Sequence, residues 1–168
     1  MAYTCAYYPT PDATLDEAQE NKFRLVFEKM NLKPGDKHLD VGCGWGSMVR
    51  YAARQGVKSL GVTLSKEQAE WAQAKIKEEG LEDLAEVRFL DYRDVTETGF
   101  DGISSIGLLE HIGVKNFASY FEFLAGKLRP GGVMVNHCIT YPDNHKTPQG
   151  DFINRYIFPD GELTGSGT

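Results

Sequence analysis

The first apolar stripe of the chain follows a helix-initiation signal. Thr14 and Glu17 form a T-x-x-E capping box, in which the threonine oxygen accepts a first-turn N–H and the glutamate reaches back. Apolar residues then recur at the spacing of one helix face: Phe23, Val26, Phe27 and Met30. A Pro-Gly pair at 34–35 ends the pattern. The segment between these signals is predicted to be an amphipathic helix.

Short apolar runs typical of strands alternate with further helical stripes. The predicted strands are residues 37–41, 57–63, 87–90, 102–106 and 133–139. The predicted helices are 47–55, a segment from the capping box Ser65–Gln68 to Gly80, and 116–128, whose buried stripe is Phe117, Phe121, Leu124 and Leu128. A turn is expected at 130–132, and no regular element from Thr140 onward. This alternation predicts an α/β fold: a Rossmann-like, doubly wound, mostly parallel sheet with helices on both faces.

Length and composition indicate one core-bearing, soluble domain. The chain has 168 residues, 41% hydrophobic and 25% charged. We expect a helical or lid segment at 1–34, a cofactor-binding core at 35–140 and the start of a substrate-covering region at 141–168. No apolar run approaches the roughly 18 residues of a membrane-spanning helix, and no signal peptide opens the chain.

The net charge and the cysteine pattern limit which binding partners and which cell compartment are expected. The net charge is −6, which disfavours a nucleic-acid partner and gives no help in docking to an anionic membrane. The three cysteines, Cys5, Cys43 and Cys138, show no C-x-x-C spacing, so neither a disulfide framework nor a metal site is expected. A cytoplasmic location is the resulting prediction.

A glycine-rich loop follows the first predicted strand directly. Residues 40–46 read Asp-Val-Gly-Cys-Gly-Trp-Gly, at the strand end where doubly wound sheets bind ligands. The G-x-G-x-G spacing is not the dinucleotide fingerprint, and the second strand ends without the acid that would bind a ribose. No G-K-S/T follows, so a P-loop is excluded. An acid at Asp40 beside this loop favours a cationic cofactor, S-adenosylmethionine.

Further motifs lie along essentially the whole chain: Tyr3–Tyr8, Leu15–Gln19, Leu39–Gly46, Gly61–Gln68, Asp91–Asp94, Ser105–Gly113, His137–Ile139 and Tyr156–Pro159. In these segments the sequence resembles the cyclopropane-fatty-acyl-phospholipid synthase family, which includes the mycolic acid cyclopropane synthases. The resemblance implies methyl transfer from S-adenosylmethionine to the cis double bond of an unsaturated fatty acyl phospholipid. A carbocation then forms, and proton loss from the transferred methyl closes a cyclopropane ring.

The resemblance also assigns residues. In the family a bound bicarbonate ion is the base, and its holders correspond here to Cys5, Glu110, His137 and the N–H of Ile139. Glu110 follows the fourth predicted strand and His137 lies in the fifth, so both are expected near the ligand-binding edge of the sheet. Cofactor contacts correspond to Tyr3, Thr4, Asp40, Gly42, Cys43, Gly44, Gly46, Thr63, Leu64, Ser65, Gln68, Tyr92 and Arg93.

Other interpretations stay open. Family members extend beyond both ends of this chain, so it is expected to be a fragment with an exposed apolar sheet edge that favours homo-oligomers. A non-catalytic cofactor-binding domain is one alternative. Another is a methyltransferase acting on a different lipid or small acceptor, including methylation without ring closure. A phospholipid substrate would bring the protein to the inner membrane surface as a peripheral protein.

Overall fold

The computed structural model describes residues 2–143, 152–156, 161–165 and 167. Its centre is a five-stranded sheet in the order β3-β2-β1-β4-β5, with every neighbouring pair parallel. The strands are β1 (Lys37–Val41), β2 (Lys58–Thr63), β3 (Ala85–Phe89), β4 (Phe100–Ile106) and β5 (Leu128–His137). The main helices are α1 (Leu15–Met30), α2 (Ser47–Arg54), α3 (Lys66–Glu78) and α4 (Phe117–Ala125). The predicted fold class is confirmed.

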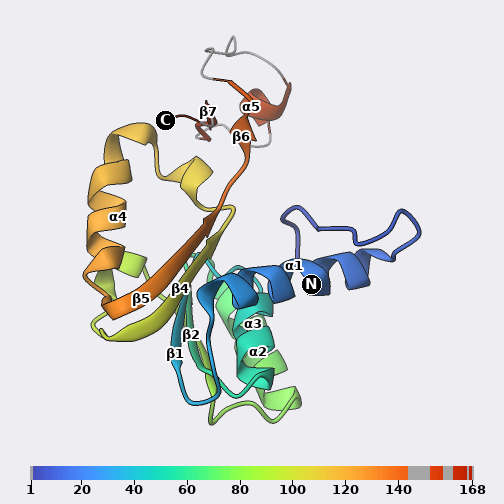
Figure 1. The fold of residues 1–168 in the computed structure, drawn as a ribbon, viewed down its shortest axis with the longest axis vertical. Coiled ribbons are helices and arrows are strands. Elements are labelled where there is room, and N and C mark those ends of the chain that lie inside the picture. Colours follow the sequence, from blue (N-terminus) through green and yellow to red (C-terminus); the bar gives the residue numbers. More distant parts are fainter. Residues whose placement is uncertain (1, 144–151, 157–160, 166, 168) are drawn as a thin grey trace.

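The sheet is covered on both faces. Helices α1, α2 and α3 lie on one side and α4 on the other (Figure 1). Leu39 and Val41 of β1 pack in the same buried cluster as Tyr120 and Leu124 of α4. The order reverses between β1 and β4, because the chain runs outward through β2 and β3 and then returns beside β1. Such a reversal opens a crevice at the carboxyl ends of the strands.

The two predicted capping boxes differ. At α1 the box is complete: Glu17 N–H donates to Thr14 Oγ1 at 3.3 Å, and Thr14 N–H donates to Glu17 Oε2 at 2.8 Å. At α3, Gln68 N–H donates to Ser65 Oγ at 3.2 Å, but the Gln68 side chain does not return to Ser65. It points instead toward Thr63 and Tyr3, so the second box is only half formed and its glutamine serves the site described below.

The predicted boundaries of α4 and β5 were wrong. The helix ends at Ala125, and Leu128 already pairs with Phe100 in the sheet. The register shifts between Phe100 and Gly102, so residues 129–132 bulge within β5 instead of forming a separate turn before it. The buried stripe of α4 is also displaced: Phe121 is 37% exposed, whereas Tyr120 is fully buried. Tyr120 can be buried because its hydroxyl donates to Ser105 Oγ at 2.9 Å.

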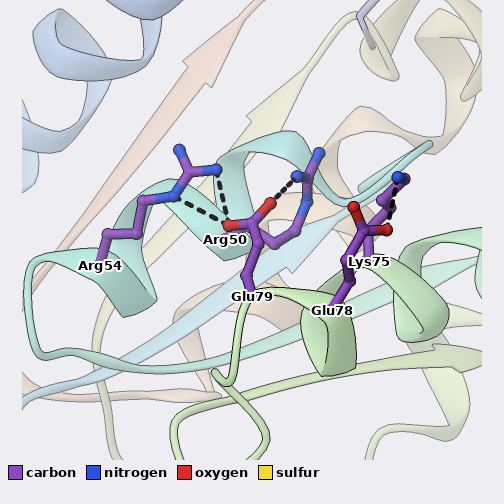
Figure 2. A network of polar contacts seen from close by, with 5 residues as sticks. All are labelled: Arg50, Arg54, Lys75, Glu78 and Glu79. Carbon is purple, nitrogen blue, oxygen red and sulfur yellow. Dashed lines mark hydrogen bonds and ion pairs between the residues drawn. The ribbon is translucent and has the colours of Figure 1, made fainter.

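An ion-pair cluster ties α3 to α2, the helix that follows the glycine loop. Glu79 lies between Arg54 and Arg50 and accepts from both, with Arg54 Nη2 at 2.7 Å (Figure 2). Burial alone would raise the pKa of Glu79, but the hydrogen bonds from the two guanidinium groups outweigh it and lower that pKa. Arg50 also lies over the Trp71 ring at 5.6 Å. These contacts hold the two helices together away from the crevice, and so fix the frame from which the loop extends.

The segment after β5 contains more regular structure than expected. Thr140–Tyr141 (β6) pairs in parallel with Thr164–Gly165 (β7), and α5 spans Phe152–Tyr156. The expectation of no regular element from Thr140 onward was therefore wrong. Residues 157–159 of the last family-like motif lie outside the described part of the chain. Among the described residues, no helix is both long enough and apolar enough to cross a membrane.

Candidate active site

A cavity of about 950 Å³ opens at the carboxyl ends of the strands, where the sheet order reverses. Sixteen of the residues singled out from the sequence line it: Tyr3, Thr4, Cys5, Asp40, Gly42, Cys43, Gly44, Thr63, Leu64, Ser65, Gln68, Tyr92, Arg93, Glu110, His137 and Ile139. Gly46 is the exception. A Cβ on Gly46 would lie 2.9 Å from Ala72 Cβ, so this glycine allows the loop to pack closely on α3.

The glycine loop, residues 42–46, turns directly off β1. Gly42 N–H and Cys43 N–H each donate to the Val62 carbonyl at 3.0 Å, which fastens the loop to the end of β2. Gly42 and Gly44 have φ angles of +72° and +53°, in the region where glycine is favoured. Because both residues line the cavity without side chains, a ligand can approach the backbone here.

Asp40 brings a buried carboxyl group to the floor of the cavity. It is the fourth residue of β1, and Ser104 Oγ of β4 donates to its Oδ1 at 2.5 Å. Burial raises the pKa of Asp40 to about 6, although the Ser104 hydroxyl and the Lys22 ammonium both act to lower it. The group is therefore ionised at neutral pH and lies at the cavity wall as an anion.

The N-terminal strap, residues 2–8, is held over the cavity by polar side chains of α1. Lys22 Nζ donates to Thr4 Oγ1 and to Gln19 Oε1, both at 2.6 Å. Gln19 Nε2 donates to the Thr4 carbonyl at 2.9 Å. Lys22 is 2% exposed, and its burial lowers its pKa to about 8. These bonds form a clamp that fixes Thr4 and aims the strap at the glycine loop.

The tip of the strap meets the start of α3. Gln68 Nε2 donates to the Tyr3 hydroxyl at 3.3 Å, while Gln68 Oε1 accepts from Thr63 Oγ1 at 2.8 Å. The Tyr3 ring lies over Gly44, where an added Cβ would be 3.7 Å from it. Tyr3 and Gln68 thus flank the loop with hydrogen-bonding groups suited to ligand hydroxyls.

The neighbouring wall carries Tyr92 and Arg93. The Tyr92 ring packs edge-on against Tyr120 at 5.3 Å between centroids. The Arg93 guanidinium is paired with Asp91, with Nε–Oδ1 at 2.9 Å and Nη2–Oδ2 at 2.6 Å. Asp91 also lines the cavity, and the sequence reasoning did not single it out as a site residue. Arg93 therefore acts on this wall as part of an ion pair.

Glu110 and His137 line the part of the cavity wall that is formed by the ends of β4 and β5. Glu110 follows β4 in a short 3₁₀ turn, Leu109–His111, and His137 is the last residue of β5. Glu110 Oε1 accepts from Ile139 N–H at 2.8 Å. Glu110 Oε2 and His137 Nδ1 are buried and have no hydrogen-bond partner among the described residues. Cys5 lines the same cavity from the strap and is exposed.

Two buried polar atoms without partners mark a place where a polar ligand is expected. Leaving a buried polar atom unpaired costs about 1–3 kcal/mol, so native sites usually satisfy such atoms with a ligand or a water. Glu110 Oε2 can accept a hydrogen bond from a ligand. His137 Nδ1 can donate or accept a hydrogen bond, depending on the tautomer of the ring.

Comparison with known proteins identifies the family. A family model described as mycolic acid cyclopropane synthetase matches residues 1–168. This chain belongs to the mycolic acid cyclopropane synthetase family. It is 65% identical over 168 residues to a probable fatty acid methyltransferase of Mycobacterium tuberculosis, covering 99% of this chain and 39% of that protein. It is 41% identical over 166 residues to the cyclopropane-fatty-acyl-phospholipid synthase of Escherichia coli, covering 97% of this chain and 41% of that protein.

Solved structures of the family agree with the fold. The mycolic acid cyclopropane synthase CmaA1 in complex with SAH and CTAB superposes with a TM-score of 0.85 at 35% identity. The match covers 98% of this chain and 62% of that one. The chain spans about two fifths of the length of the curated relatives named above.

Some residues of this family member were not singled out from the sequence as site residues. Lys22 and Gln19 build the strap clamp, and their signal was present: both fall on the face of the first helix that also carries Val26. A lysine on an apolar helix face signals a buried charge with partners. Ser104, the direct partner of Asp40, carried no such signal, because the two are 64 residues apart and meet only through sheet pairing.

Proposed function

We propose that the protein transfers a methyl group from S-adenosylmethionine to the cis double bond of an unsaturated acyl chain of a phospholipid and closes a cyclopropane ring. One observation carries the proposal: a single cavity has an anionic glycine-loop end at Asp40 and a second polar end at Glu110 and His137. Family membership supports methyl-transfer chemistry. A phospholipid substrate implies that the reaction takes place at a membrane surface.

The residues at the glycine-loop end fit a cationic adenosyl cofactor. When bound, S-adenosylmethionine supplies an electrophilic methyl group on a sulfonium. The Asp40 carboxylate attracts the positive charge of the methionine end. Gly42 and Gly44 let that end approach the backbone, and Gln68 offers an amide to hydroxyl groups. The structure of CmaA1 with SAH supports this assignment.

The residues at the other end fit the task of proton removal. Methyl addition to an alkene leaves a carbocation, and one proton of the new methyl must depart for the ring to close. Glu110 carries a negative charge that stabilises nearby positive charge. A bicarbonate held here would satisfy Glu110 Oε2 and His137 Nδ1, the two buried atoms without partners. The Ile139 N–H already donates to Glu110, so it would hold the ion only by exchanging that bond.

Methylation without ring closure is the second candidate function. The name of the 65% identical relative, a probable fatty acid methyltransferase, favours it. The occupied Ile139 N–H favours it as well, because one of the four predicted bicarbonate holders is engaged elsewhere.

The test uses the full-length protein. It is incubated with S-adenosylmethionine and vesicles of dioleoyl phosphatidylglycerol, and the acyl chains are analysed by mass spectrometry before and after mild hydrogenation. A gain of one CH₂ unit that resists hydrogenation is expected for the cyclopropane. A product that takes up two further hydrogens is a branched alkene and would favour the second candidate. Absence of any CH₂ gain, with calorimetric binding of S-adenosylmethionine retained, would indicate a non-catalytic binding protein or a different acceptor.

A further inference from the structure

A row of buried polar side chains runs through the sheet beneath the cavity. Its members, from β2 through β1 and β4, are Ser59, His38, Ser104 and Asp40, which we call the polar row. His38 Nδ1 is 2.7 Å from Ser59 Oγ, and His38 Nε2 is 2.9 Å from Ser104 Oγ. Ser104 Oγ in turn is 2.5 Å from Asp40 Oδ1. All four are at most 3% exposed. Only Asp40 reaches the cavity, and the proposed reaction uses none of the other three.

The chemistry of the partners fixes the direction of every hydrogen bond in the polar row. An ionised carboxylate only accepts, so the single hydroxyl proton of Ser104 is donated to Asp40. Ser104 then has no proton left for His38, and His38 Nε2 must donate to it. Burial lowers the pKa of His38 to about 3, so the ring is neutral and carries one N–H. Nδ1 therefore accepts from the Ser59 hydroxyl.

We propose that neutral His38, protonated on Nε2, is a positioning residue that directs the Ser104 hydroxyl toward Asp40 and so maintains the anion that faces the cationic methionine end of the cofactor. Every donor in the polar row points toward Asp40, and aligned hydrogen bonds strengthen one another in a low-dielectric interior. The identification of the ligand as S-adenosylmethionine rests on the proposed function. The tautomer of His38 and the direction of the hydrogen bonds in the polar row do not depend on it.

The charge state of Asp40 is sensitive to the loss of such a donor. The titratable groups that interact with it electrostatically are Lys22 from α1, Cys43 from the glycine loop and, from the other side of the sheet, Tyr120 of α4; of these three groups only Lys22 is cationic. A hydrogen bond to a charged group is of a strength equivalent to about one to two pKa units. Ser104→Ala should therefore raise the pKa of Asp40 by about that amount. His38→Leu, which acts one bond further away, should raise it less.

The pH dependence of cofactor affinity reports this shift. Below the pKa of Asp40 the carboxyl is neutral and attraction for a cation is lost, so the affinity for S-adenosylmethionine falls as pH decreases. Calorimetry of the full-length protein between pH 5.5 and 8 should show this fall moved to higher pH in Ser104→Ala, and moved less in His38→Leu. The matched control is Ser105→Ala, the adjacent buried serine, which faces the opposite side of the sheet and pairs with Tyr120. Its profile should coincide with the wild type.

A second measurement is independent of the ligand. Two-bond ¹⁵N–¹H correlation spectra of histidine-labelled protein, assigned with His38→Leu, should show His38 protonated on Nε2 only at pH 8, where Asp40 is ionised, and should show the ring neutral from pH 8 to 5.5. If His38→Leu does not fold, the His38 signals can be assigned with Ser59→Ala instead. This milder change removes only the hydroxyl that donates to His38 Nδ1, so it alters the Nδ1 signal alone. An Nδ1–H tautomer at pH 8, protonation of the His38 ring between pH 8 and 5.5, or coincident profiles for Ser104→Ala and wild type would each overturn the proposal. Wild-type protein that binds no S-adenosylmethionine would refute the proposed function, while the tautomer would still decide the direction of the polar row.

Discussion

Replacing Gly61 with alanine probes how β2 supports the glycine loop. A Cβ on Gly61 would lie 2.6 Å from Val49 Cγ2 and 2.9 Å from both Cβ and Sγ of Cys43. Val49 and Cys43 are buried, and Cys43 is fastened by its N–H to the Val62 carbonyl, so neither can move aside freely. Overpacking of this kind costs about 1–3 kcal/mol, from which the lower chain entropy of alanine recovers about 0.5–1 kcal/mol. The net expectation is a loss of about 1–2 kcal/mol of unfolding free energy.

The same change should weaken cofactor binding, because Cys43 lines the cavity and is one of the two residues displaced. Urea unfolding measures the first effect and calorimetry with S-adenosylmethionine the second. Gly99→Ala is the control: Gly99 has a φ of +73°, and apart from its chain neighbours no atom of the described residues lies within 4 Å of an added Cβ. It should lower stability by about 1 kcal/mol through backbone strain and leave cofactor affinity unchanged.

A double-mutant cycle with Val49→Ala isolates the steric cause. Val49→Ala alone removes buried methyl groups and should cost about 2 kcal/mol. In the double variant the new methyl of residue 61 occupies part of the vacated space, so the combined loss should be smaller than the sum of the single losses by at least about 1 kcal/mol. Additivity within about 0.5 kcal/mol would refute the reasoning, because it would mean that the two side chains do not collide.

Three further predictions follow from the site. Gly44→Val puts a branched side chain at a φ of +53° beside the ligand path and should abolish S-adenosylmethionine binding with the fold retained; unchanged calorimetric affinity would count against the site. Glu110→Gln in the full-length protein should lower turnover by about 10²-fold with little change in cofactor affinity, and near-normal ring formation in both Glu110→Gln and His137→Ala would contradict their assignment. The pKa of buried Lys22 is about 8 instead of 10.5, so the unfolded state binds more protons between these values and stability rises with pH across that window. Lys22→Met should lack this rise, which we expect to amount to about 2 kcal/mol of unfolding free energy after screening by solvent. If the curves of unfolding free energy against pH run parallel for wild type and variant, the amine is not buried as described.

Local signals predicted most of the fold. Capping residues, apolar spacing and the glycine loop act within a few residues of one another, so Thr14, Ser65 and the carboxyl ends of β1, β2 and β4 could be located from the chain alone. The errors arose where tertiary pairing overrides local preference. Residues 129–132 resemble a turn, yet Leu128 is already held in the sheet by Phe100. Tyr120 is buried in place of Phe121, because Ser105, fifteen positions earlier, satisfies its hydroxyl.

The residues of the candidate site likewise fall into those that the sequence could indicate and those that only the folded structure brings together. Motif resemblance located the residues on the cavity wall, but not the partners that set their properties. Ser104 lies 64 positions from Asp40, and His38 lies 66 positions from Ser104. Such pairs meet only after the strand order is known, and a single sequence does not contain that order. The pairing of Ile139 N–H with Glu110 likewise depends on how β5 ends beside the turn after β4.

The way in which Asp40 is stabilised suits a group that must remain charged toward a ligand. A direct ion pair with Lys22 would neutralise the carboxylate, but the Lys22 ammonium donates to Thr4 and Gln19 and acts on Asp40 only through space. A hydroxyl donor such as Ser104 stabilises the anion without cancelling its charge. Burial, in turn, limits screening by solvent and strengthens the attraction for a cation in the cavity. Lys22 therefore holds the N-terminal strap in place, while the polar row maintains the Asp40 anion. The hydrogen bonds that stabilise the strap are separate from those that stabilise the carboxylate.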